Sequence, residues 1–455
     1  MNSRFPRAAW ISLLGLTLAG PVSAQTAPAS TPASPPASPP TSPPDESLLG
    51  TVEVDGSAGG LPPLPKLGMI SLTPAGDSDQ LTQTVVRRDL DLSGQYDVLA
   101  AEAPDPLAPR DGPVDLAPWR AKGAEVVVRV RAEARGASTD IVAEAYLTAK
   151  AGAPSSGPEA GKPVYQTTVS AGQEVRAASH RVVDELVGAL TGRPASFASH
   201  MTFARRSGTW QTAAIVDADG YNPRLASPSD VTVLSPAFGP GGILYYLVSR
   251  DYAPFRVVVG PAATPLPIRI PGSVLGLAIS PEGTRAALTV MSDGKSSIFT
   301  ADGGKLTELT ASPLAHHPAF GPLGKVAYVG GTPVQRVHVD GAAVSPPGFM
   351  ASAPTFCDTA QGLWIIFTVE VAGGAELVST DTSGGSMRRL TQRQGENRYP
   401  ACSPDGRLIA FFSTTKSGAG PGLYVMPVGR PWLAKKVSSE LGQSLRWERL
   451  PAVKR

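Results

Sequence analysis

Short apolar runs separated by tight turns fill the C-terminal half of the chain and predict β-strands in a repeating order. Each repeat has a strand-like run that leads into a proline turn, two further strand-like runs, a tight turn often marked by Asp-Gly, and one more run. The turns SPEG (280–283) and SPDG (403–406) align the copies, and the equivalent positions are separated by 41, 41, 36 and 46 residues. These positions are Pro240, Pro281, Pro322, Asp358 and Pro404. A period near 40 with four short strands per repeat is typical of a β-propeller.

The same pattern predicts how the ring of repeats closes. Five repeats are complete, whereas a sixth is divided between the two ends of residues 200–449. Residues 201–226 would supply its second, third and fourth strands, and residues 445–450 its first. Closure of this kind leaves no free sheet edge. We therefore predict an all-β six-bladed β-propeller over residues 200–449, closed by 445–450 pairing with 201–226.

Before the propeller, strand and helix patterns alternate over residues 46–192 and predict an α/β domain. Residues 67–72 indicate a buried strand, 79–90 a helix, and 95–99 a short strand. Trp119 would lie in a short helix. The remaining elements are a hairpin with one covered face, formed by 126–131 and 141–146, and an amphipathic helix from Val175 to a C-cap at Gly192.

The N-terminus has the pattern of an exported protein. Arg4 and Arg7 precede an apolar run from Ala8 to Leu18, and small residues end at Ala24. The run is shorter than the ~20 residues that span a bilayer, so it predicts a signal peptide over 1–24 instead of a membrane anchor. Residues 25–45, rich in Ala, Pro, Ser and Thr, predict a disordered spacer, and 451–455 a tail.

The composition of the chain narrows the range of possible functions. Charged residues make up 17% of the chain and the net charge is +2, which argues against a nucleic-acid partner because phosphate binding needs a dense basic face. Two cysteines, Cys357 and Cys402, lie in the first strands of neighbouring repeats. Strand alternation directs them to opposite faces, so we expect two buried thiols and not a disulfide.

These motifs, taken in order, resemble the TolB family of the Tol–Pal system of Gram-negative bacteria. The resemblance rests on HRVVDELVGALTG (180–192), AAIVDADGYNPRLASPS (213–229), DLDLSGQYDVL (89–99), WRAKGAEVVVRV (119–130) and the repeats at 280, 318 and 400. It covers residues 50–450. Two departures are FCDTAQG (356–362) in place of SPDG, and Leu277-Ala278-Ile279 where an aromatic residue is usual.

The resemblance implies a non-enzymatic periplasmic adaptor that supports outer-membrane integrity and cell division. A Pal-like lipoprotein would dock on loops that join each fourth strand to the next first strand. These residues are Ser273, Val274, His316, His317, Ala351, Ser352, Arg398 and Tyr399. A TolA-like protein would bind the segment that occupies the place of the family's N-terminal strand. That segment comprises Thr51, Val52, Glu53, Val54, Asp55 and Gly56. We expect a monomer that does not span a membrane.

Catalytic and metal sites were considered and set aside. Propellers also cap serine peptidases, but these need a G-x-S-x-G elbow, which does not occur here, and the five residues after 450 leave no room for their catalytic domain. His180 is expected on the surface of its helix. His316 and His317 are expected on a loop, and the turn from Asp217 to Asn222 lacks the acidic residue that closes a calcium loop. We predict no enzyme activity, no metal and no cofactor.

An alternative is a periplasmic propeller that binds a glycan or another small ligand in its channel. Trp210, Trp364 and Trp447 would then have to point into the channel. Trp447 lies in a predicted first strand, where packing in the core is the better explanation.

Overall fold

A computed structural model describes residues 44–50, 60–103, 108–148, 161–310, 314–392, 395–415 and 419–449. The predicted signal peptide, most of the spacer, the segment 51–56 and the tail 451–455 lie outside the described residues. Within the described ranges, no helix has both the length and the apolar character needed to cross a membrane.

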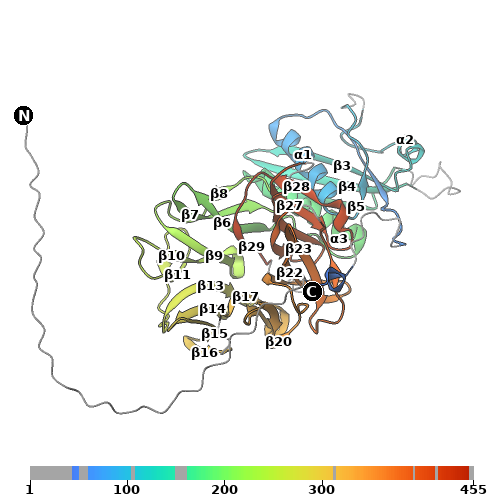
Figure 1. The fold of residues 1–455 in the computed structure, drawn as a ribbon. Coiled ribbons are helices and arrows are strands. Elements are labelled where there is room, and N and C mark those ends of the chain that lie inside the picture. The colour runs from blue at the N-terminus through green and yellow to red at the C-terminus, as the bar shows by residue number, and fades with distance from the viewer. Residues whose placement is uncertain are drawn as a thin grey trace, which may run out of the picture. The chain divides into compact units, whose positions relative to one another are not determined.

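A five-stranded sheet with strand order β2-β1-β3-β4-β5 forms the N-terminal domain (Figure 1). β1 pairs in parallel with β2 and β3, and the remaining pairs are antiparallel. Its elements are β1 (Lys66–Met69), α1 (Asp77–Leu92), β2 (Asp97–Val98), α2 (Ala117–Ala121), β3 (Val126–Arg135), β4 (Ser138–Leu147), β5 (Tyr165–Gly172) and α3 (Val175–Thr191). The predicted helices and the predicted hairpin are thereby confirmed.

Apolar residues at helical spacing hold α1 and α3 on one face of this sheet. Val86 on α1 and Val182 and Leu186 on α3 are fully buried in one core with Val128 of β3. α3 ends where predicted, because Gly192 adopts a left-handed conformation with φ of 81°.

The other face of the hairpin is also buried. Val127 of β3 packs with Tyr146 of β4 and with Trp119 of α2. The prediction of a single covered face was therefore wrong. A strand that is buried on both faces usually has a continuous run of apolar residues. Arg129 and Arg131 interrupt the run in residues 126–131, so the sequence suggested one polar face.

Antiparallel four-stranded sheets of similar layout follow in the C-terminal part. Four are separate sheets, β13-β14-β15-β16, β17-β18-β19-β20, β21-β22-β23-β24 and β25-β26-β27-β28. The first two comprise β13 (Ser273–Ile279), β14 (Arg285–Ser292), β15 (Lys295–Asp302), β16 (Lys305–Glu308), β17 (His316–Phe320), β18 (Val326–Gly330), β19 (Arg336–Val339) and β20 (Ala342–Ala343). The next two comprise β21 (Ala351–Thr359), β22 (Gly362–Val371), β23 (Gly374–Asp381), β24 (Arg388–Arg389), β25 (Asn397–Cys402), β26 (Leu408–Ser413), β27 (Gly422–Pro427) and β28 (Lys435–Ser438).

The remaining strands form one larger sheet that contains two sets of four. One set is β9-β10-β11-β12, and the other is β29-β6-β7 with β8 on β7. A single parallel pair, Gln211 with Thr232, joins the sets. Their strands are β6 (His200–Ser207), β7 (Trp210–Asp217), β8 (Arg224–Leu225), β9 (Thr232–Phe238), β10 (Leu244–Ser249), β11 (Arg256–Val259), β12 (Thr264–Pro265) and β29 (Gln443–Trp447). Short 3-10 helices are η1 (Glu46–Leu49), η2 (Pro240–Gly242), η3 (Pro322–Gly324) and η4 (Pro431–Leu433).

The first strands of the six sets contact one another in cyclic order and define a propeller-like ring (Figure 1). We call β9, β13, β17, β21, β25 and β29 the inner strands. The last of them, β29, pairs antiparallel with β6, so that Trp447 lies opposite Met201. Residues from the two ends of the C-terminal part thus build one set of strands.

Every inner strand contains a bulge at an equivalent position. The pairing register shifts in β9, β13, β17, β21, β25 and β29. Five residues at this position have positive φ, namely Ser235, His317, Ala353, Tyr399 and Ser444. Four of these five precede a proline, a residue that disfavours the right-handed helical conformation just before it. A bulge inserts one residue and bends the strand.

Cys357 and Cys402 form a disulfide with Cα atoms 5.3 Å apart, so the prediction of two buried thiols was wrong. Sheets in this ring pack face to face, so the front of one sheet meets the back of the next. Ile366 from one sheet and Ile409 from the following sheet lie in the same core as Cys357. Two cysteines that point to opposite faces of equivalent strands in neighbouring sheets therefore face each other across the space between the sheets.

Candidate functional site

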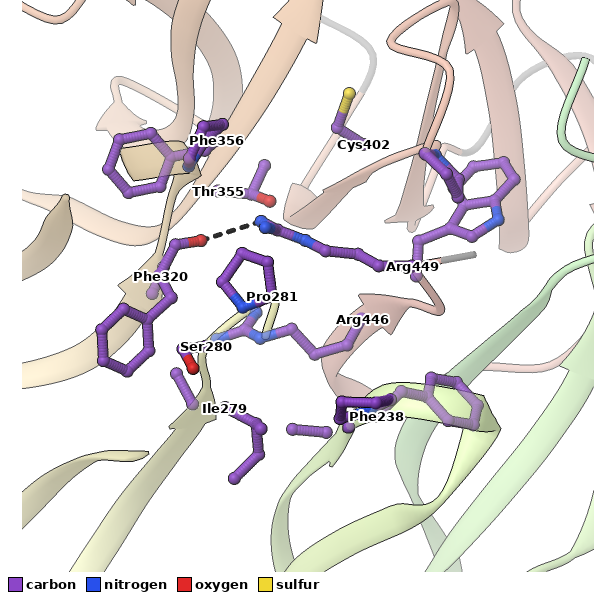
Figure 2. Close-up of a pocket in the computed structure, with 18 of the residues that line it drawn as sticks. Phe238, Ile279, Ser280, Pro281, Phe320, Thr355, Phe356, Cys402, Arg446 and Arg449 are labelled. Atoms are coloured by element: carbon purple, nitrogen blue, oxygen red, sulfur yellow. Dashed lines mark hydrogen bonds between the residues drawn. The ribbon is translucent and has the colours of Figure 1, made fainter. Parts of the chain in front are cut away.

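The C-terminal ends of the inner strands surround a cavity of about 490 Å³, which we call the axial cavity (Figure 2). Every inner strand, with the turn after it, contributes to its lining. Pockets that hold small molecules in proteins are typically of this size.

Apolar side chains make up much of the wall, as Figure 2 shows. They include Phe238, Ile279, Pro281, Phe320 and Phe356. The hydroxyls nearby serve the turns: Ser280 Oγ accepts from Arg285 N–H at 3.1 Å, and Ser403 Oγ accepts from Leu408 N–H at 2.9 Å. Ser403 Oγ also donates to the carboxylate of Asp405 within the same turn, so both hydroxyls are engaged in turns and the lining suits binding.

Two arginines extend into the cavity from the last inner strand and the residues after it (Figure 2). Arg446 crosses to β17, where it donates to the carbonyl of Pro318 at 3.4 Å, and it also donates to the carbonyl of Leu445 at 3.1 Å. Arg449 donates to the carbonyl of Phe320 at 2.8 Å. The pKa of Arg446 falls to about 10 because of burial and the charge of Arg449, so Arg446 stays protonated at neutral pH.

Acidic groups lie only toward the outer mouth among the described residues that line the cavity. Glu282 and Asp358 are exposed there. Burial lowers the pKa of Arg449, and these two carboxylates partly oppose that effect. The positive charge of Arg446 is thus the least compensated charge in the cavity.

The sequence contained a signal for both arginines that the prediction missed. When the bulges are aligned, the position of Arg446 holds a small residue in every other repeat: Ala237, Ala278, Ala319, Thr355 and Ala401. The position of Arg449 is the repeat marker itself, held elsewhere by Pro240, Pro281, Pro322, Asp358 and Pro404. In this repeat, arginines occupy two positions that hold small residues, proline or aspartate in the other repeats. This difference indicates that the two arginines have a function specific to this repeat.

The eight residues predicted to contact a Pal-like partner lie at the other ends of four inner strands. Ser273 and Val274 begin β13, His316 and His317 begin β17, Ala351 and Ser352 begin β21, and Arg398 and Tyr399 lie in β25. The prediction that they lie on loops was wrong, because pairing continues through the bulge of each strand. We call this end of the ring the channel opening.

Burial divides these eight residues. Val274 and Ala351 are buried, with 1% and 2% of their surface exposed, so they cannot offer a contact surface in this conformation. The other six are half-buried. Arg398 is held by both carboxylate oxygens of Glu370, at 2.5 and 3.0 Å, and by Glu396 at 3.0 Å.

The two adjacent histidines contact each other and not a carboxylate. Their Nδ1 atoms are 3.0 Å apart, and His316 Nε2 is 3.1 Å from Gln335 Oε1. His317 Nδ1 accepts the Ala353 N–H at 3.3 Å. Burial, His316 and Arg446 lower the pKa of His317 to about 3, so this ring is neutral at physiological pH.

A second polar centre joins the N-terminal domain to the ring, and we call it the interface cluster. It comprises Arg88 and Asp89 of α1, Arg176 and His180 of α3, and Asp217 and Asp219 at the end of β7. His180 is 3% exposed and its Nδ1 lies 2.6 Å from Asp89 Oδ2, so the prediction of a surface histidine was wrong. Its helix is covered on that side by α1 and by the ring.

The aspartates of this cluster bind arginines. Asp217 accepts from Arg176 at 2.9 Å, and Asp219 accepts from both Arg176 and Arg88. Both guanidinium groups also lie over the ring of Tyr221, at 4.9 and 4.4 Å from its centroid. His180, Asp217 and Asp219 are close enough together to hold a metal ion. Because arginines already neutralise the carboxylates, the donor set fits an ion-pair network better than a cation site.

Comparisons with known proteins agree with this architecture. Residues 64–149 match the family described as the TolB amino-terminal domain. The Tol-Pal system protein TolB of Thiobacillus denitrificans is 35% identical over 172 residues, which is 37% of this chain and 38% of that protein. The protein of the same name from Anaeromyxobacter dehalogenans is 29% identical over 251 residues, 52% of this chain and 55% of that protein. The chain thus matches about half or less of the length of these relatives.

Among solved structures, that of TolB from Acinetobacter baumannii superimposes with a TM-score of 0.67 at 18% identity. The match covers 85% of this chain and 97% of that chain, so the fold is shared across both domains. By its amino-terminal domain, its curated relatives and its fold, the chain is similar to TolB, as its sequence motifs predicted.

Proposed function

We propose that this protein is a TolB-family adaptor of a Tol–Pal system, located in the periplasm and without enzyme activity. The observation that carries the proposal is that curated proteins named Tol-Pal system protein TolB align with this chain, one of them over 172 residues at 35% identity. In this role the protein would support outer-membrane integrity and cell division through its two partners.

We further propose that the ring is a six-bladed propeller whose channel opening binds a Pal-like lipoprotein. Half-buried polar and aromatic side chains gather there, among them His316, Arg398 and Tyr399. Side chains of these types are common at protein interfaces. The ion pairs of Arg398 with Glu370 and Glu396 would hold its guanidinium in place before binding, which lowers the entropic cost of association.

For a TolA-like protein we propose the segment 51–56 as the binding strand. The residues just before it are anchored on the ring: Leu49 is fully buried in the core with Phe349 and Val378, and Glu46 pairs with Arg389 at 3.0 Å. In this proposal, the segment after the anchor would add as a strand to the edge of a partner's sheet.

A binding experiment with two variants at opposite ends of the ring tests the Pal site. The mature chain (25–455) and the soluble part of Pal from the same organism would be measured by biolayer interferometry. Ser352→Arg places a large charged side chain at the channel opening and is expected to weaken binding at least about tenfold by steric exclusion. Glu282→Arg, at the far end beside the axial cavity, is the matched control and should bind like the parent protein.

Equal affinity for both variants, with folding verified by circular dichroism, would move the Pal site away from the channel opening. Absence of Pal binding by the parent chain would reject the adaptor function. A chain that begins at residue 57 should lose TolA binding and keep Pal binding. If it binds TolA as well as the longer chain does, residues 51–56 are not the strand that TolA recognises.

A further inference from the structure

We propose that the axial cavity binds a small organic anion, whose carboxylate or phosphate group pairs with Arg446 and Arg449 while its apolar part contacts the apolar wall. This ligand site is distinct from the adaptor function, because none of the eight residues predicted to contact a Pal-like partner lines the cavity. The proposal rests on the partners of the two arginines, the shape of the cavity and the distribution of charge around it.

Arg446 is half-buried and Arg449 is exposed, and within the described residues neither has the carboxylate partner that the fully buried arginines have. Arg129 is bound by Glu144, with Nε and Oε2 2.6 Å apart. Arg131 pairs with the same Glu144, and Arg389 pairs with Glu46 at 3.0 Å. Buried guanidinium groups are thus neutralised in the rest of the fold, as the cost of burying a charge requires.

Within the described residues, Arg446 and Arg449 donate only to the backbone carbonyls of Leu445, Pro318 and Phe320. A guanidinium carries five N–H donors in a planar fork that matches a carboxylate or a phosphate. Most donors of both groups therefore remain available. An oxyanion in the cavity would supply the missing acceptor and the missing negative charge together.

The repeat structure explains why space exists beside Arg446. The equivalent positions of the other five repeats carry four alanines and a threonine, so five of the six inner strands contribute little volume at this level. Arg446 crosses to Pro318 and occupies part of this space. A cavity of about 490 Å³ remains beside it.

The chemistry of the wall defines the rest of the ligand. Alanine and proline residues such as Ala278, Ala319 and Pro281 line the cavity, whereas the carboxylates of Glu282 and Asp358 are exposed at its edge. The acidic mouth disfavours highly charged anions. The cavity therefore suits a compact ligand with one anionic group and an apolar body, instead of a polyphosphate or an acidic polymer.

Isothermal titration calorimetry with matched probes tests this inference on the mature chain. Benzoate and phenyl phosphate carry the two candidate head groups on one apolar body, and benzyl alcohol lacks the charge. Acetate and inorganic phosphate lack the body. We expect benzoate or phenyl phosphate to bind, and each of the other three to bind at least about tenfold more weakly, as expected for a lost charge-assisted contact or lost apolar burial.

Two variants connect binding to the cavity. Arg446→Ala restores the residue found at this position in most other repeats, so the variant should fold, and it should weaken anion binding about tenfold or more. Arg449→Gln is a second, more exposed change with the same expected direction. The control is Arg206→Gln, which removes an exposed arginine whose hydrogen-bond partner, within the described residues, is the backbone carbonyl of Gly208 at 3.3 Å.

Each outcome decides the proposal. Preferential binding of one aromatic anion, lost in Arg446→Ala or Arg449→Gln and kept in Arg206→Gln, supports it, and the better of the two probes identifies the head group. Equal binding of benzyl alcohol, unchanged binding in both cavity variants, or no binding of either anion at about 10 mM would each overturn it.

Discussion

Replacing Asp219 by asparagine keeps the size of the side chain but removes a carboxylate that joins the two domains. Asp219 is fully buried and accepts from Arg176 and Arg88. Its Oδ1 also accepts the N–H of Tyr221 at 3.2 Å. The substitution would leave two guanidinium groups with less compensation at the junction of α1, α3 and β7.

The expected magnitude follows from the burial of the partners. Removal of one partner from a fully buried ion pair costs about 3–5 kcal/mol. The side chains of Arg176 and Arg88 are 21% and 28% exposed, so solvent screens part of this loss. We therefore expect a decrease of about 3 kcal/mol in the free energy of unfolding, which is a change of about a hundredfold in the unfolding equilibrium.

Urea denaturation followed by circular dichroism measures this change, with Asp230→Asn as the control. Asp230 pairs with Arg250 at 2.9 Å, but both side chains are more than half exposed, so its loss should cost less than about 1 kcal/mol. The reasoning is refuted if Asp219→Asn is no more destabilising than Asp230→Asn. A double-mutant cycle with Arg176→Met should give a coupling energy of about 1–3 kcal/mol.

Three other changes test other parts of the structure. The double variant Cys357→Ala/Cys402→Ala should lose about 4 kcal/mol of stability, because the disulfide closes a 45-residue loop, and equal urea midpoints with and without reductant would contradict this. Gly406→Ala should cost about 2–4 kcal/mol by thermal denaturation, since its Cβ would clash with the backbone of the neighbouring repeat; Gly294→Ala, also at positive φ but in open space, should cost only about 1 kcal/mol. Burial lowers the pKa of His180, but the nearby carboxylate of Asp89 raises it by more. The pKa of His180 is therefore raised in the folded protein. Its contribution to stability is therefore present at low pH and lost as pH rises through that pKa. As pH rises above the usual histidine pKa of about 6.5, the stability of the parent should fall, whereas that of His180→Gln should change less; parallel curves would show that His180 does not cause the loss.

Much of the ring could be predicted because each repeat carries its own local signals. The SPEG and SPDG turns fix where one inner strand ends and the next strand begins, and Gly283 and Gly406 both have the positive φ that such turns require. Strand β29 was found because LRWERL follows the last complete repeat, and strand β6 because 201–207 lacks an inner strand before it.

The errors arose where the answer depends on contacts between repeats or domains. The bulges at His317 and Tyr399 extend strand pairing into residues that the sequence placed on loops. The pairing of Cys357 with Cys402 depends on how neighbouring sheets face each other, which alternation along a single strand does not contain. His180 seemed exposed on an isolated helix because the aspartates that cover it belong to α1 and to β7.

The pairing of β29 with β6 also has a consequence for the order in which the protein is made. Met201 emerges from the ribosome long before Trp447, its partner across the pairing. Throughout that interval the edge of β6 is an unsatisfied row of hydrogen-bonding groups, which another chain can use as a template. Slow, non-local strand pairing of this kind also limits folding rate. The chain is therefore exposed to edge-to-edge aggregation until its final strand has paired, and a premature stop before Gln443 makes that exposed edge permanent.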